Sequence, residues 1–142
     1  MTEWITPKTD WYGAYSNGVY SGDRFNYNDY NRIKNNLEYL HDLAESFYNS
    51  FDINDVGDDK EMGDFYYADE INAMEENLVT ITNNSLNIDY GDAPTYEANG
   101  LTPDYTELNR LESAILDLYE KLNNAYAGRR KLTFYLGDKE VF

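Results

Sequence analysis

The sequence contains no cysteine and a single histidine, and both shortages limit its chemistry. Without cysteine the chain has no disulfide, no thiolate metal site and no cysteine nucleophile. The absence of cysteine does not indicate whether the protein works in an oxidising or a reducing compartment. His41 stands alone, whereas histidine-rich metal sites and Ser-His-Asp triads need more than an isolated imidazole. The turn-rich stretch "SNGVYSG" lacks the lysine of a phosphate-binding loop. We therefore predict a protein that is not an enzyme and holds neither metal nor cofactor.

Basic residues and long apolar runs are also scarce. The chain has 11 Lys and Arg residues against 27 Asp and Glu residues, for a net charge of -16. Phosphate backbones and anionic lipids repel such a chain, so direct binding to nucleic acid or a membrane is disfavoured. The apolar runs are too short for a transmembrane helix, and "MTEWITPKTD" lacks the basic and apolar stretches of a signal peptide. We expect a protein that is used without classical secretion.

The chain does have enough apolar material for one core. Hydrophobic residues make up 42% and charged residues 27% of its 142 residues, which is near the average for globular proteins. Its 15 Tyr, 6 Phe and 2 Trp residues can bury large areas. A chain of this length is too short for two comfortable cores, so we expect a single domain over residues 1–142.

One six-residue phrase recurs three times, as "NDYNRI" at 28–33, "DEINAM" at 69–74 and "TELNRL" at 106–111. After each copy, apolar residues recur at alternating spacings of three and four, which is typical of one helix face. This pattern predicts helices near 28–51, 69–84 and 104–126. The expected fold is mainly α, a three-helix bundle over 28–126 built from an internal threefold helix repeat. The predicted core includes Leu37, Leu40, Leu78, Leu111, Ile115 and Leu118.

Each phrase begins with a residue able to cap a helix and carries an asparagine three positions later. We predict that Asn28, Asp69 and Thr106 lie at the caps or within one or two residues of them. The asparagines are Asn31, Asn72 and Asn109. We interpret each pair as a capping box with Asn in place of Glu or Gln. In the alternative interpretation, the three asparagines converge on a ligand, because they occupy equivalent helix positions.

The two ends of the chain are predicted to be non-helical. Residues 1–27 are expected to form an irregular aromatic arm, since "SNGVYSGDRF" is rich in turn formers. The segment "KLTFYLGDKEVF" at 131–142 alternates around Gly137 and Asp138, which predicts a C-terminal β-hairpin. A lone hairpin is marginally stable, so it must pack on the bundle or pair with the arm or another subunit.

The acidic connection "DINDVGDDKEMGD" at 52–64 partly matches a calcium-binding EF-hand loop. The match fails at Val56 and Gly63, which stand where two of the oxygen ligands are needed. We interpret the segment as a flexible, solvated loop. Adventitious binding of a divalent cation is the open alternative, and its carboxylates would be Asp52, Asp55, Asp58, Asp59 and Asp64.

Aromatic side chains gather near the N-terminus. The candidate partner-binding residues are Trp4, Trp11, Tyr12, Tyr15 and Tyr20. Exposed, these rings could stack on sugars or anchor a protein partner, because aromatic side chains dominate interface energies. Alternatively, the arm lies across the bundle and the indoles fill gaps between helices, since large exposed aromatic patches are uncommon on monomers.

The stretches "WITPKTDW" at 4–11 and "DRFNYNDYNRIKNNLEYL" at 23–40 resemble segments of tail-region and other structural proteins of phages and prophages of Firmicutes. In those proteins a "PKT-x-W" opening leads to an "F-N-x-x-D-Y-N-R-I" helix start. Weaker echoes occur in the third phrase and in "YLGDKEVF". The resemblance implies a structural role in a phage particle or prophage, and no catalytic residue carries over.

Two functions follow as hypotheses. The first is a phage structural or assembly protein of the tail or baseplate, in the virion and in the host cytoplasm during assembly, with other phage structural proteins or further copies as partners. The alternative is an acidic, phage-encoded inhibitor that imitates nucleic acid and blocks a host defence protein. An inhibitor needs carboxylates in a continuous stripe at the spacing of phosphates, whereas a structural protein can spread them over all its solvated faces.

Overall fold

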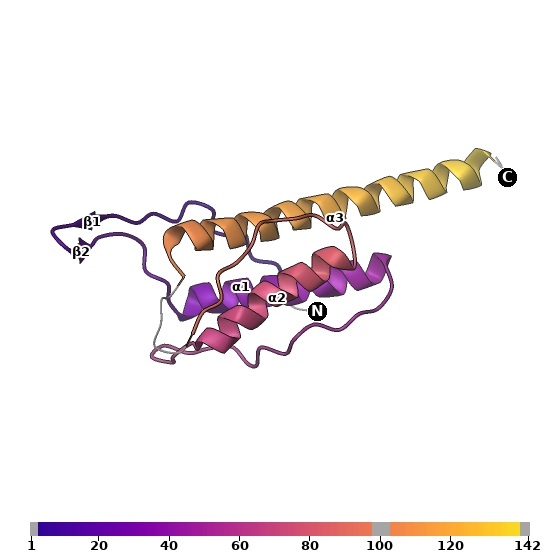
Figure 1. Ribbon diagram of the computed structural model, residues 1–142. Coiled ribbons are helices and arrows are strands. Elements are labelled where there is room, and N and C mark those ends of the chain that lie inside the picture. Colours follow the sequence, from indigo (N-terminus) through magenta and orange to yellow (C-terminus); the bar gives the residue numbers. More distant parts are fainter. Residues whose placement is uncertain (1–2, 98–102, 140–142) are drawn as a thin grey trace.

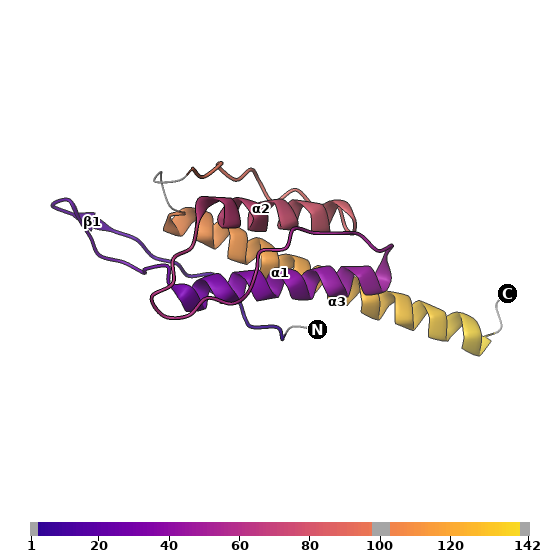
Figure 2. The same ribbon diagram turned by 90° about the horizontal axis from the view of Figure 1, so that it is seen from below.

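Three helices run side by side and in the same direction (Figures 1 and 2). The computed structural model describes residues 3–97 and 103–139, with side chains as far as residue 125. The helices are α1 (Tyr27–Phe47), α2 (Ala68–Asn83) and α3 (Tyr105–Lys139). All three begin at one end, so the connections 48–67 and 84–104 return the chain to that end. The predicted class, mainly α with three packed helices, is confirmed.

The start of each helix is fixed by local hydrogen bonds. The Asn26 side chain caps α1 and the Asp29 carboxylate accepts from the Asn26 N–H at 3.0 Å, which completes a capping box. At α2 the Glu70 carboxylate accepts from the Tyr67 N–H at 2.9 Å. At α3 the Asp104 carboxylate accepts from the N–H groups of residues 106 and 107. Each cap lies two residues before Asn28, Asp69 or Thr106, which is within the one or two residues predicted.

The core follows the apolar pattern of the sequence. Leu37, Leu40, Leu78, Leu111, Ile115 and Leu118 are all buried, as predicted. They belong to one cluster whose helical members keep the same register behind each helix start, from Tyr30, Ile71 and Leu108 onward. Each buried Leu or Ile side chain contributes about 1.5–3 kcal/mol before the entropy cost is subtracted. The periodicity alone therefore located the buried face of every helix.

The predicted C-terminal hairpin is wrong, because α3 continues through residues 131–139. Residues 140–142 lie outside the described part of the chain. Extending an existing helix adds one hydrogen bond for each residue fixed, whereas a lone hairpin is marginal in water. Gly137 costs about 1 kcal/mol relative to Ala in a helix, which is small beside the gain from propagation.

A two-stranded hairpin forms instead near the N-terminus. Strand β1 (Tyr15–Ser16) pairs antiparallel with β2 (Val19–Tyr20). The two turn residues, Asn17 and Gly18, have φ values of 53° and 75°. Asn-Gly is the preferred pair for such a turn, because both positions need positive φ. The N-terminal arm is therefore not wholly irregular, and the Asn-Gly pair was the signal that could have revealed its hairpin.

Candidate protein-interaction site

Three extended segments, here named straps, cross the grooves between the helices. Strap 1 comprises residues 5–11, strap 2 residues 54–60 and strap 3 residues 90–96. Each repeated asparagine pairs with both the N–H and the C=O of one strap residue: Asn31 with Lys60, Asn72 with Tyr96, and Asn109 with Trp11. All six distances lie between 2.7 and 2.9 Å. We name each such pair a clamp.

The clamps overturn both predictions for these asparagines. The capping-box partners are Asp29 and Glu70, which stand two residues before Asn31 and Asn72. The asparagines do not converge on a ligand either, because each holds a different strap. A side-chain amide that accepts from an N–H and donates to the C=O of the same residue reproduces the pairing of a β-ladder.

Two further clamps lie on α1 and α2, about one and a half turns beyond Asn31 and Asn72. Asn36 pairs with Ile5 at 2.7 and 3.0 Å, and Asn77 pairs with Asn54 at 2.8 and 3.0 Å. Both amides are buried, so each would be costly to leave unpaired. The equivalent position of α3 is Ala114, which has no side-chain amide. The start of strap 3 is attached to α3 in another way, because the Tyr90 hydroxyl donates to the Asp117 carboxylate at 2.7 Å.

We predict that each clamp holds its strap locally. Asn109→Ala removes two hydrogen bonds to Trp11, which stabilise by about 1 kcal/mol each. The Trp11 amide should therefore exchange with solvent about tenfold faster or more, measured by native-state hydrogen exchange. The clamped amides of Lys60 and Tyr96 should change far less. Asn124→Ala, at an exposed position of α3, is the control; equal acceleration of all three strap amides would contradict local clamping.

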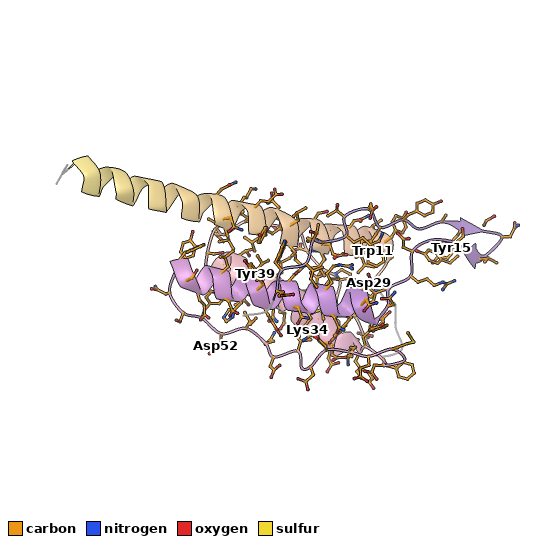
Figure 3. The ribbon with its side chains drawn as sticks, turned by 180° about the vertical axis from the view of Figure 1, so that it is seen from behind. Trp11, Tyr15, Asp29, Lys34, Tyr39 and Asp52 are labelled. Atoms are coloured by element: carbon orange, nitrogen blue, oxygen red, sulfur yellow. The ribbon has the colours of Figure 1, made fainter. Side chains whose placement is uncertain are left out.

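Trp11 lies inside the structure, between α1 and α3 (Figure 3). Its indole N–H donates to Glu112, whose side chain is fully buried. The same carboxylate accepts from Arg32 at 2.6 and 2.8 Å and from the Lys8 N–H at 3.1 Å. Burial lowers the pKa of Arg32, but the hydrogen bond and charge of Glu112 raise it overall, so the guanidinium stays charged.

Trp4 is half-buried and stacks on Tyr119 of α3, with ring centroids 3.9 Å apart and planes 6° apart. Tyr39 of α1 contacts both rings at centroid distances of 5.7 and 5.9 Å. Both indoles therefore pack against the bundle, as in the alternative in which the arm fills gaps between helices.

The tyrosines of the arm are placed differently. Tyr15 is 77% exposed and Tyr12 61% exposed, on a hairpin that projects beyond the helix starts (Figures 1 and 3). Tyr20 is half-buried, and its hydroxyl donates to the Asp23 carbonyl at 2.7 Å. The base of the hairpin lies on α3, where a Cβ added to Gly13 would come within 2.3 Å of the Tyr105 ring. The hairpin is thus anchored at its base and exposed at its tip.

Other exposed apolar side chains lie in segments close to the helix starts. They are Val19, Met62, Phe65, Tyr67 and Tyr105. Phe25, behind the hairpin, contacts Tyr66 edge to face at 4.9 Å, which joins the arm to the segment before α2. The end of the bundle where the helices begin therefore carries most of the large exposed apolar side chains of the described residues.

The acidic connection is held in place, which corrects the prediction of a flexible loop. Beyond its two clamps, the buried Lys34 ammonium donates to the Gly57 carbonyl at 3.1 Å and pairs with Asp59 at 2.9 Å. The side chains of Asp52, Asp55, Asp58, Asp59 and Asp64 remain exposed. Figure 3 shows Asp52 beside the last turns of α1, on the connection, and Lys34 facing the connection.

The acidic connection forms no cluster of metal ligands among residues 3–97 and 103–125. In that part of the chain, three ligand groups come together only at His41, Asp42 and Glu45. Asp42 faces Nδ1 at 3.5 Å and Glu45 faces Nε2 at 3.4 Å, on opposite sides of the imidazole ring. Nε2 also lies 2.7 Å from the Phe51 carbonyl oxygen, so both ring nitrogens have contacts within the chain. The contact between His41 and Phe51 joins the last turns of α1 to the connection that follows the helix.

A second buried ion pair joins α2 to α3. Arg110 contacts Glu75 at 2.5 Å and Glu107 at 3.0 Å. Burial raises the pKa of the Glu75 carboxyl, and the charge of Arg110 partly offsets that rise. Beside this pair, the Tyr96 hydroxyl is the one buried side-chain polar atom without a hydrogen-bond partner in the described part of the chain. Burial and then the charges of Glu107 and Glu75 raise the pKa of Tyr96 to about 12.

No protein-family model, curated protein or solved structure matches this chain. No helix in the described ranges is both long enough and apolar enough to span a membrane.

Proposed function

We propose that this protein is a non-enzymatic phage structural or assembly protein, associated with the tail or baseplate, that acts through protein–protein contacts. It works in the virion, and in the host cytoplasm during assembly, with other phage structural proteins or further copies as partners. The observation that carries the proposal is the hairpin, which projects from a packed bundle and exposes Tyr12, Tyr15 and Val19. Exposed aromatic side chains on a rigid support favour tight contacts, because little conformational entropy is lost on binding.

The segments that resemble phage structural proteins have definite places in the fold. "WITPKTDW" contains strap 1 and the two packed indoles of Trp4 and Trp11, and "FNYNDYNRI" contains the cap Asn26 and the clamp residue Asn31. The first motif therefore contains strap 1, and the second contains the start of α1, the helix that follows this strap. This supports a scaffold role for the module and brings no reactive group with it.

The proposed scaffold is an internal threefold repeat of strap and helix. Straps 1 and 2 each begin at a clamp on the helix that follows them, Ile5 on Asn36 and Asn54 on Asn77. All three end at a clamp on another helix, in the cyclic order α3, α1 and α2. The equal length of the straps and the common register of the core side chains support the repeat. Such a unit ties every helix to both neighbours, which suits a rigid spacer.

An affinity experiment from phage-infected cells tests the contact proposal. Binding through aromatic side chains should persist at 1 M salt, where the Debye length is about 3 Å. We expect the wild-type protein to retain phage structural proteins at high salt, and the double variant Tyr12→Ala/Tyr15→Ala to lose them. Tyr67→Ala is the matched control, since Tyr67 is 60% exposed but lies at the start of α2 instead of on the hairpin.

The acidic inhibitor remains a second candidate, favoured by the distribution of charge. Among the described side chains, all the lysines and arginines except Arg24 pair with a carboxylate of the chain, and Arg24 lies over the Tyr20 ring. The exposed carboxylates of the connection 52–64 are thus left without compensating cations beyond Lys34 and Lys60. Capture of a host DNA-binding protein that elutes as salt is raised would replace the assembly proposal with this one.

A further inference from the structure

The groove between α2 and strap 3 contains a cavity of about 970 Å³. Its wall is formed by α2 from Asn72 to Asn83 and by the returning segment 87–95, which runs along α2 in Figure 2. Asn54, clamped to α2, closes one side of it. The cavity therefore lies over the outer face of α2, between straps 2 and 3.

The clamp pattern is broken in the strap that borders this groove. Straps 1 and 2 are tied to helices at both ends by Asn amides, of which Asn36 and Asn77 are buried. Strap 3 has such a clamp only at Tyr96, because Ala114 replaces the amide that would hold its other end. This end of strap 3 is attached to α3 through the side chains of Tyr90 and Asp117. The hydrogen bond therefore uses neither the backbone N–H nor the backbone C=O of Tyr90.

The lining of the cavity favours a positively charged occupant. It includes the carboxylates of Glu75, Glu76, Asp89 and Asp92 and one cation, Arg110. The Arg110 guanidinium is already engaged by Glu75 and Glu107, so the groove keeps an excess of negative charge. Val79 lies on the same wall and is 52% exposed, which offers an apolar surface for the stem of a long side chain.

The groove also presents an amide suited to an extended backbone. The side chain of Asn83 lines the cavity and makes no hydrogen bond within the described residues. The chain uses the same group, a helix-borne Asn amide, to hold its own straps at five places. An extended segment laid along α2 would offer Asn83 a free N–H and C=O, as Ile5 offers them to Asn36.

We infer that this groove binds an extended, basic segment of a partner protein, with Asn83 pairing to its backbone and the carboxylates of Glu76 and Asp92 receiving its lysine or arginine side chains. The inference rests on the proposed function, because it assumes that the protein acts by contacting other proteins. It names a second surface in addition to the aromatic hairpin. This surface recognises the charge and the backbone of a partner, whereas the hairpin binds through aromatic side chains.

The test uses the full chain and an acetylated heptapeptide of alternating lysine and valine, with a glutamate–valine peptide as the charge control. We expect saturable binding of the lysine peptide, with amide chemical-shift changes confined to residues 72–95 and to the other lining residues Asn54 and Arg110. The variant Asn83→Ala/Asp92→Asn should bind about tenfold more weakly. The matched control Asn49→Ala/Asp58→Asn makes the same two changes at exposed positions outside the groove and should bind like the wild type.

Three outcomes would overturn the inference. They are absence of saturable binding, shift changes spread over residues 55–64 of the connection, and equal weakening in both double variants, which would indicate attraction to the net charge alone. None of these outcomes depends on the hairpin or on phage proteins. Failure of the groove is therefore distinguishable from failure of the proposed assembly function, which the Tyr12 and Tyr15 variants test.

Discussion

Glu112→Ala is expected to lower the free energy of unfolding by about 3–5 kcal/mol, the usual effect of removing one partner of a buried ion pair. The carboxylate is fully buried and accepts hydrogen bonds from Arg32, from the Trp11 indole and from the Lys8 N–H. Its removal leaves the largely buried Arg32 guanidinium with Asp29, 3.0 Å away, as its remaining carboxylate partner, and leaves the Trp11 indole and the Lys8 N–H unpaired. The loss is measured by urea unfolding followed by circular dichroism.

The control for this prediction is Glu120→Ala, which removes an exposed carboxylate from the same helix. That change should stay within about 0.5 kcal/mol, as surface substitutions usually do. A similarly small loss for Glu112→Ala would mean that strap 1 is not held against α3 through this carboxylate. Because Glu112 joins α1, α3 and strap 1, the variant should also release Trp11, visible as a shift in its fluorescence.

Leu118→Ala is expected to cost about 2–5 kcal/mol of stability, because truncation of a buried leucine leaves a cavity as well as losing the transferred methyl groups. Leu118 is fully buried in the cluster that joins all three helices. Val79→Ala is the matched control, since Val79 is also an apolar helix residue but is half exposed. A loss below about 0.5 kcal/mol for Leu118→Ala would place this part of α3 outside the core.

The placement of the candidate interaction residues could be foreseen only in part. The aromatic pattern selected Trp4, Trp11, Tyr12, Tyr15 and Tyr20 together, because sequence alone does not separate packed rings from exposed ones. The separation depends on partners far along the chain: Glu112 for Trp11 and Tyr119 for Trp4. The tyrosines of the hairpin have no such partner on the bundle, apart from the anchoring of Gly13 beside Tyr105.

The groove over α2 had a signal that a comparison of the repeats can find. Asn36 and Asn77 stand at equivalent positions, and the third position is occupied by Ala114. The sequence shows that the third position has no amide. The consequence of this difference becomes clear only from the structure, in which Asn36 and Asn77 each hold a strap. The other repeated asparagines, Asn31, Asn72 and Asn109, were interpreted as capping-box partners, since capping is the commonest local use of such residues.

The sequence by itself determined where the three helices begin and which face of each is buried, because the apolar period and the core positions depend on residues three and four apart. It did not determine the continuation of α3 to Lys139. Only the tertiary structure decided that the helices run parallel and that extended straps return between them. It also decided the role of the repeated asparagines, whose clamp partners lie 24 to 98 residues away. Short-range periodicity carries no information on such pairs, since they form only where packing brings an amide beside an unpaired backbone group.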